Sequence, residues 1–195
     1  MFSIKKTPAF DRQPIAWTHK LADYNGGSTL SSSELAQNIV YEGTPVGLDS
    51  TGLLHVIKTA KLSASASNSA TTYTVFKGHN FKVGDVIMAK TASKAYTITA
   101  IATNSEDATS DDITVGTTLG TALAEGSIIY QAASEVASTS ALKYAPLGLL
   151  DASYDIETLG NQMVAVVTIG QIRESNIKSG VGDLIKSLLP TIKFI

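Results

Sequence analysis

The pattern of apolar and polar positions in this chain of 195 residues predicts mostly β structure. Between residues 71 and 132, short runs rich in β-branched and aromatic residues are separated by turn residues. These five runs are Thr72–Phe76, Phe81–Met88, Tyr96–Ile101, Ile113–Val115 and Ser127–Tyr130. Short strands at this spacing predict a small β-barrel or sandwich.

Stretches of small residues border this β unit on both sides. Residues 63–70 and 132–140 consist mostly of serine and alanine, which have too little bulk to build a core. We therefore expect residues 63–140 to form an inserted small all-β domain together with its linkers.

The segments outside these linkers resemble each other. Pro45-Val46-Gly47-Leu48-Asp49 is echoed by Pro146-Leu147-Gly148-Leu149-Leu150-Asp151. One interpretation makes them neighbouring strands of a single sheet, so that residues 34–62 and 141–195 form one core domain. The alternative is a coincidence of a common strand-entry pattern. The turn residues 49–52 favour a tight connection between two strands.

Residues 1–33 show no sustained helical or strand period and contain prolines, paired glycines and a serine run. We interpret them as an extended N-terminal arm with isolated apolar anchors. The candidate anchors are Phe2, Ile4, Phe10 and Trp17. An ordinary N-terminal strand and loop of the same domain would explain the pattern equally well.

Near the end of the chain, apolar residues fall on one face of a short helix. Val181, Leu184, Ile185, Leu188 and Leu189 have helical spacing. We expect Ser179 to cap the helix and Pro190 to end it. An alternating tail follows, so the candidates for core or subunit packing are Val181, Leu184, Ile185, Leu188, Ile192 and Phe194.

The composition limits the possible partners and chemistry. Hydrophobic residues make up 44% of the chain, which is typical of a globular protein, whereas charged residues make up only 16%, which is low for a monomer kept soluble by its charge. The net charge of −2 gives no broad basic surface for a nucleic acid, and no apolar stretch approaches the length of a membrane span. The first residues do not have the pattern of a secretory signal. The absence of cysteine excludes disulfides and thiolate metal sites.

Candidate catalytic groups are sparse. His55 alternates with Leu53 and Ile57, which predicts a hydrogen-bonded histidine within a sheet rather than a ligand. The acidic residues between 106 and 112 lack the spacing of a calcium loop and indicate a solvated hairpin. Because no motif of a nucleophile, phosphate loop or zinc site is present, we expect neither an enzyme nor a bound metal or cofactor.

The order of the motifs resembles that of the lambda-type head decoration proteins of tailed bacteriophages. The similar features are the strand entry Gly43 to Asp49, the return Pro146 to Leu150, and the strand, helix and strand from Val164 to Ile195. The resemblance covers about half of the chain, and small family members have no equivalent of residues 63–140.

This resemblance implies a mainly β, β-tulip-like core with one short C-terminal α-helix. It also implies a virion protein that is assembled in the host cytoplasm, forms a homotrimer and stabilises the major capsid protein lattice from outside. With its insertion, the chain is similar to an auxiliary capsid protein of a crAss-like phage. The alternative is a head fibre or tail-associated adhesion protein whose inserted β-domain binds a host surface.

Overall fold

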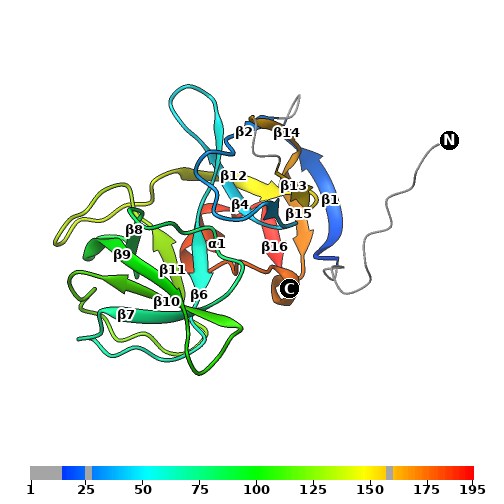
Figure 1. The fold of residues 1–195 in the computed structure, drawn as a ribbon. Helices are drawn as coiled ribbons and strands as arrows, with labels where there is room; N and C mark the ends of the chain where they lie inside the picture. The colour runs from blue at the N-terminus through cyan, green and yellow to red at the C-terminus, as the bar shows by residue number, and fades with distance from the viewer. Residues whose placement is uncertain (1–14, 25–27, 157–159) are drawn as a thin grey trace.

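The computed structural model describes residues 15–24, 28–156 and 160–195 and confirms a mainly β fold (Figure 1). An eight-stranded sheet has the order β1-β15-β12-β4-β5-β2-β14, and β16 also pairs with β15. Its strands are β1 (Trp17–Asp23), β2 (Ser28–Leu30), β4 (Pro45–Leu48), β5 (Leu54–Val56), β12 (Ala145–Leu150), β14 (Gln162–Val164), β15 (Val166–Ile172) and β16 (Ile192–Phe194). A separate pair joins β3 (Ile39–Val40) to β13 (Tyr154–Asp155).

The second sheet has six strands in the order β6-β11-β8-β9-β10-β7. These strands are β6 (Thr59–Lys61), β7 (Thr72–Phe76), β8 (Val86–Met88), β9 (Ala95–Thr103), β10 (Ser110–Val115) and β11 (Ile128–Gln131). An antiparallel bridge between Leu62 and Val75 joins the two ends of this order. The sheet therefore curls into a small barrel, one of the two forms that the strand spacing predicted. The barrel begins at Thr59, before the expected domain boundary at residue 63.

The two echoed segments are neighbouring antiparallel strands, β4 and β12, with Gly47 opposite Pro146 and Val46 opposite Gly148. Each motif glycine lies where another strand comes close. A Cβ atom on Gly47 would be 2.2 Å from the carbonyl oxygen of Ala145, and one on Gly148 would be 2.5 Å from that of Val167. The repeated Pro-x-Gly pattern thus reflects close backbone packing in one sheet, with a bulge between Pro146 and Gly148.

The described part of residues 1–33 belongs to this sheet. β1 pairs antiparallel with β15, and β2 pairs with β14 and β5. From Trp17 onward, the alternative of an ordinary N-terminal strand therefore replaces the interpretation as an extended arm. Residues 1–14 lie outside the described residues.

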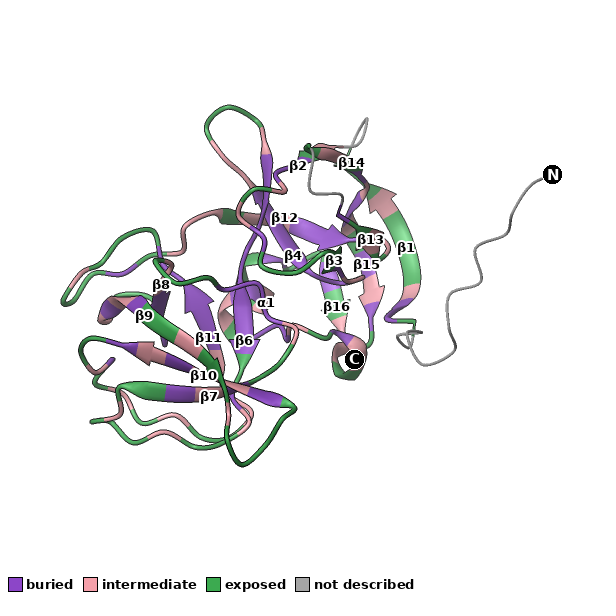
Figure 2. Cartoon of the chain, viewed as in Figure 1, coloured by how far each residue is buried: buried purple, intermediate pink, exposed green. Residues whose placement is uncertain are grey.

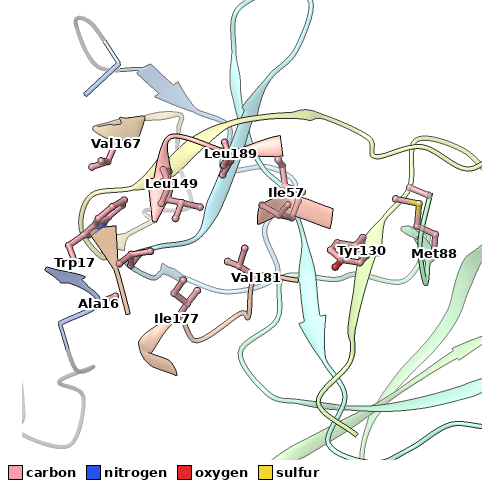
Figure 3. Close-up of a cluster of buried hydrophobic side chains, with 14 of the residues drawn as sticks. Ala16, Trp17, Ile57, Met88, Tyr130, Leu149, Val167, Ile177, Val181 and Leu189 are labelled. Carbon is pink, nitrogen blue, oxygen red and sulfur yellow. The ribbon is translucent and has the colours of Figure 1, made fainter. Parts of the chain in front are cut away.

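The larger sheet and the barrel share one continuous hydrophobic core (Figure 3). Met88 and Tyr130 enter this core from the barrel, whereas Trp17 and Leu149 enter from the larger sheet. Ile185 of the helix is fully buried in the same cluster. A second core fills the barrel around Tyr73 and Phe81. Because burial of apolar side chains is the main source of stability, the shared core holds the two units in one body.

The C-terminal helix is shorter than the sequence predicted. α1 (Asp183–Leu188) begins after Gly182, which has no side chain to cap it, so the expectation of Ser179 as the N-cap was wrong. Gly180 has a φ of 74°, a left-handed conformation that interrupts a helix before it can begin at Ser179. The helix follows a short 3-10 turn, η2 (Glu174–Asn176), and ends before Pro190, as expected.

Candidate functional site

The predicted anchors of the N-terminal arm have different outcomes. Phe2, Ile4 and Phe10 lie outside the described residues. Trp17 is only 6% exposed, and its indole nitrogen donates a hydrogen bond of 2.9 Å to the carbonyl oxygen of Leu150. It therefore packs inside its own chain and is not an exposed anchor in this structure. Leu21, four residues later on the edge strand β1, is 75% exposed.

The predicted C-terminal packing residues are mostly internal. Val181, Ile185 and Ile192 are buried in the core shared with the barrel, and Leu184 and Phe194 pack partly against it. Leu188 is different, because 48% of its side chain is exposed on α1. Figure 2 shows the buried positions of the chain, which include most of β4 and β11 and the second half of β12. Leu188 is thus the member of this set best placed to contact another molecule.

A polar cluster that the sequence did not predict lies beside β5. The ring of His55 lies 3.3 Å from Glu34 through Nδ1 and 3.2 Å from Asp49 through Nε2. Tyr144 stacks on this ring, with ring centroids 4.2 Å apart. Lys143 and Tyr144 donate to the Glu34 carboxylate at 2.9 and 3.1 Å. His55 is thus a hydrogen-bonded sheet residue, as expected.

The electrostatics of this cluster favour ionised carboxylates. Burial opposes the charge on Glu34, but the hydrogen bond and positive charge of Lys143 hold the pKa of Glu34 below its ordinary value. The hydroxyl of Thr51 and the backbone N–H of Leu53 hold the pKa of Asp49 low. Since these contacts satisfy the polar groups, we interpret the cluster as a structural junction.

A second polar group is buried near the start of the barrel. Lys58 is almost fully buried and donates to Oδ2 of Asp85 at 2.7 Å. The side chain of Gln131 donates to Oδ1 of the same carboxylate at 3.0 Å, and the backbone N–H of Lys82 donates to Oδ2. Burial lowers the pKa of Lys58, while the bond to Asp85 opposes this effect. The ion pair between Lys58 and Asp85 therefore connects the start of β6 to the start of β8.

A cleft of about 600 Å³ lies between the barrel and the segment that leads into α1. Its walls include Lys61 and Tyr130 from the barrel and Glu174, Gly182 and Lys186 from the C-terminal segment. Lys186 is paired with Glu174 at 2.7 Å, which neutralises both groups. Because positive and negative side chains both line the cleft, its surface has no dominant charge.

The acidic hairpin holds its carboxylates in local hydrogen bonds. Asp107 accepts bonds from Thr109 and Ser110, and Asp112 accepts from Thr74 and the amide of Asn104. Within the described ranges, no group of three or more histidine and acidic side chains is arranged to hold a metal ion. In the same part of the chain, no helix is both long and apolar enough to span a bilayer.

Comparison with protein-family models, with curated proteins and with solved structures gave no match. The sequence resemblance and the geometry of the chain therefore carry the functional argument.

The polar clusters had no local sequence signal. Glu34 and Lys143 are separated by 109 positions, and Lys58 and Asp85 by 27. The pattern around His55 predicted a hydrogen-bonded sheet residue but not its partners, and the run Phe81–Met88 does not indicate which lysine Asp85 binds.

Proposed function

We propose that this protein is a structural component of a phage virion that binds the outer capsid surface and stabilises the lattice of the major capsid protein. It acts as a homotrimer on the assembled head. This role requires no catalytic group, metal or cofactor.

The observation that carries the proposal is the pairing of β4 with β12. The resemblance rests on separate segments of the chain, and their order alone could be accidental. The Gly43 to Asp49 and Pro146 to Leu150 segments share one sheet with β15 and β16. The strands in the segments that carry the resemblance therefore belong to one sheet, α1 lies outside it, and the barrel is inserted between β5 and β12 of the chain.

The surface of the larger sheet also supports contact with another protein. β1 lies at one end of the strand order, so one side of its backbone has no strand partner among the described residues. Exposed edge strands readily accept a strand from another chain. Two exposed apolar residues lie at this same end of the larger sheet. They are Leu21 on β1 and Ile169 on the neighbouring strand β15.

Cosedimentation with expanded, undecorated phage heads, followed by heating, tests the proposal. We expect saturable binding that raises the temperature at which the heads rupture. Leu21→Asp should weaken binding, whereas Val83→Asp, which changes an exposed apolar residue of the barrel, should not. If the folded protein fails to bind heads, the alternative of an adhesion protein that uses the barrel gains support. Binding of the protein to host cells, lost in Val83→Asp, would then establish that alternative.

A further inference from the structure

The loop that joins β7 to β8, residues 77–85, holds the segment that follows β2. We name residues 31–38 the joining segment. Its Gln37 backbone N–H donates to Oδ1 of Asn80 at 3.3 Å. Its Ser33 carbonyl oxygen accepts from Nζ of Lys82 at 3.0 Å. These two bonds connect the barrel to the larger sheet outside their shared core.

His79 controls the shape of this loop from a buried position. Its side chain is 4% exposed, and Nδ1 accepts a hydrogen bond of 3.2 Å from the backbone N–H of Phe81. An acceptor nitrogen must carry a lone pair, so the neutral ring has its proton on Nε2. That nitrogen is buried and lies 3.4 Å from Oδ2 of Asp111, in a geometry that does not make a hydrogen bond. The hydrogen bond between His79 and Phe81 spans Asn80, and it therefore restrains the backbone of this loop residue.

We propose that His79 is a pH-responsive catch: its neutral ring keeps Asn80 of the 77–85 loop bound to Gln37 of the joining segment, and this bond is released when Nδ1 takes up a proton. A protonated Nδ1 is a donor and faces the Phe81 N–H, which is also a donor. The bond between them is then lost. Asn80 lies between these two residues in the chain, so its bond to Gln37 is lost with it.

The charges around the ring set the conditions for release. Asp111 of β10 lies 3.4 Å from Nε2 and favours protonation, while Lys77 lies 3.7 Å from the same carboxylate and weakens this attraction. Burial lowers the pKa of His79 below its ordinary value of 6.5, and the positive charge of Lys58 acts in the same direction. The catch therefore stays closed at neutral pH and opens only in acid.

Release is local. Leu35 of the joining segment is buried in the larger sheet's own core, and the carbonyl oxygen of Asn38 accepts from the N–H of Ile156 at 2.6 Å. These contacts do not involve His79. The core shared by the two units also remains intact. The catch is a property of the fold and does not depend on the proposed capsid role.

Nuclear magnetic resonance of the full chain tests the catch. The ring signals of the three histidines and the exchange protection of the Gln37 amide are followed from about pH 8 down to the pH at which the whole protein unfolds. We expect Gln37 protection, corrected for the intrinsic pH dependence of exchange, to fall about ten-fold with the midpoint of His79. Gln37 protection that stays constant while His79 titrates overturns the proposal. So does a His79 that stays neutral until the whole protein unfolds.

Two variants separate the catch from general acid effects. In His79→Asn, the side-chain oxygen can accept from the N–H two residues later but does not titrate, so Gln37 protection should become independent of pH. His19→Gln removes an exposed histidine on β1 and should leave the wild-type transition unchanged. A transition that persists in His79→Asn contradicts the proposal. If His79→Asn does not fold, the joint titration of His79 and Gln37 in the wild type decides.

Discussion

The indole nitrogen of Trp17 donates a hydrogen bond of 2.9 Å to the carbonyl oxygen of Leu150, which fastens the first described strand to the middle of the larger sheet. A Cβ atom on Gly170 would lie 2.8 Å from the Trp17 ring, so the glycine provides room for the indole. The backbone N–H of Trp17 also donates to Glu42 at 2.9 Å. A truncation that tests the proposed arm must therefore stop before this residue.

Deletion of residues 2–14 should leave the thermal unfolding profile unchanged, because Trp17 and its contacts remain. The same deletion should abolish binding to expanded heads, because it removes the proposed anchors Phe2, Ile4 and Phe10. Trp17→Ala should instead lower the free energy of unfolding by about 3–5 kcal/mol. Calorimetry and cosedimentation measure the two effects separately. A truncated protein that still binds heads would refute the capsid-binding arm.

Much of the barrel could be predicted because its signals are local. The run Thr72–Phe76 is rich in residues that favour strands, and it forms β7 as expected. Helix α1 was predicted less well. Of the five apolar residues with helical spacing, only Leu184, Ile185 and Leu188 lie within α1, because the left-handed Gly180 delays its start beyond Ser179 and the helix ends at Leu188.

The polar clusters could not be predicted, because their members meet only after the chain folds. The 109 positions between Glu34 and Lys143 include the whole barrel. Trp17 shows the same limit. An aromatic residue in a segment without a regular period is as compatible with an exposed anchor as with a core residue, and only its pairing with β15 and its burial decide between them.

Gly47→Ala should destabilise the larger sheet by about 1–3 kcal/mol, because its new methyl group would meet the fixed carbonyl oxygen of Ala145. Backbone atoms in a paired strand cannot move aside easily. Gly116→Ala is the matched control, since nothing lies within 4 Å of its Cβ position. Urea unfolding measures both changes. Equal stability of the two variants would show that the close packing of β4 and β12 is not required.

Asp85→Ala should cost about 3–5 kcal/mol, because it leaves the buried Lys58 ammonium without its partner. Lys58→Met should cost less. The methionine removes the buried charge, and Asp85 keeps its bonds from Lys82 and Gln131. The double variant should be more stable than Asp85→Ala alone. Chemical denaturation of the wild type and the three variants gives the coupling energy, and a value near zero would contradict the pairing.

Stability should fall in acid partly through Glu34. Its folded pKa lies below the ordinary value of 4.5, so the unfolded chain binds more protons between these two values. The contribution of Glu34 is therefore complete above pH 4.5 and is lost as the pH falls through the folded pKa.

Glu34→Gln should lower the melting temperature at neutral pH and reduce its further decline in acid. Melting temperatures recorded from about pH 7 to about pH 3 test this expectation. Glu125→Gln, at an exposed position of the barrel, should match the wild type throughout. If the melting temperature of Glu34→Gln fell in acid as steeply as that of the wild type, groups other than Glu34 would cause the loss of stability.

Ile185 and Leu188 lie on the same short helix but should respond differently to substitution. Ile185 is completely buried, so Ile185→Ala should lower the free energy of unfolding by about 2–5 kcal/mol. Leu188→Ala should cost about 1 kcal/mol or less, because almost half of its side chain already contacts solvent.

Leu188→Asp then tests whether α1 faces a partner. If Leu188 packs against another subunit or the capsid, the variant should fold normally but lose trimers or head binding, because burying an unpaired carboxylate at an interface is unfavourable. Analytical ultracentrifugation and cosedimentation distinguish these two losses. A variant that folds, trimerises and binds heads like the wild type would place the contact surface elsewhere, and the exposed edge strand β1 would become the next region to test.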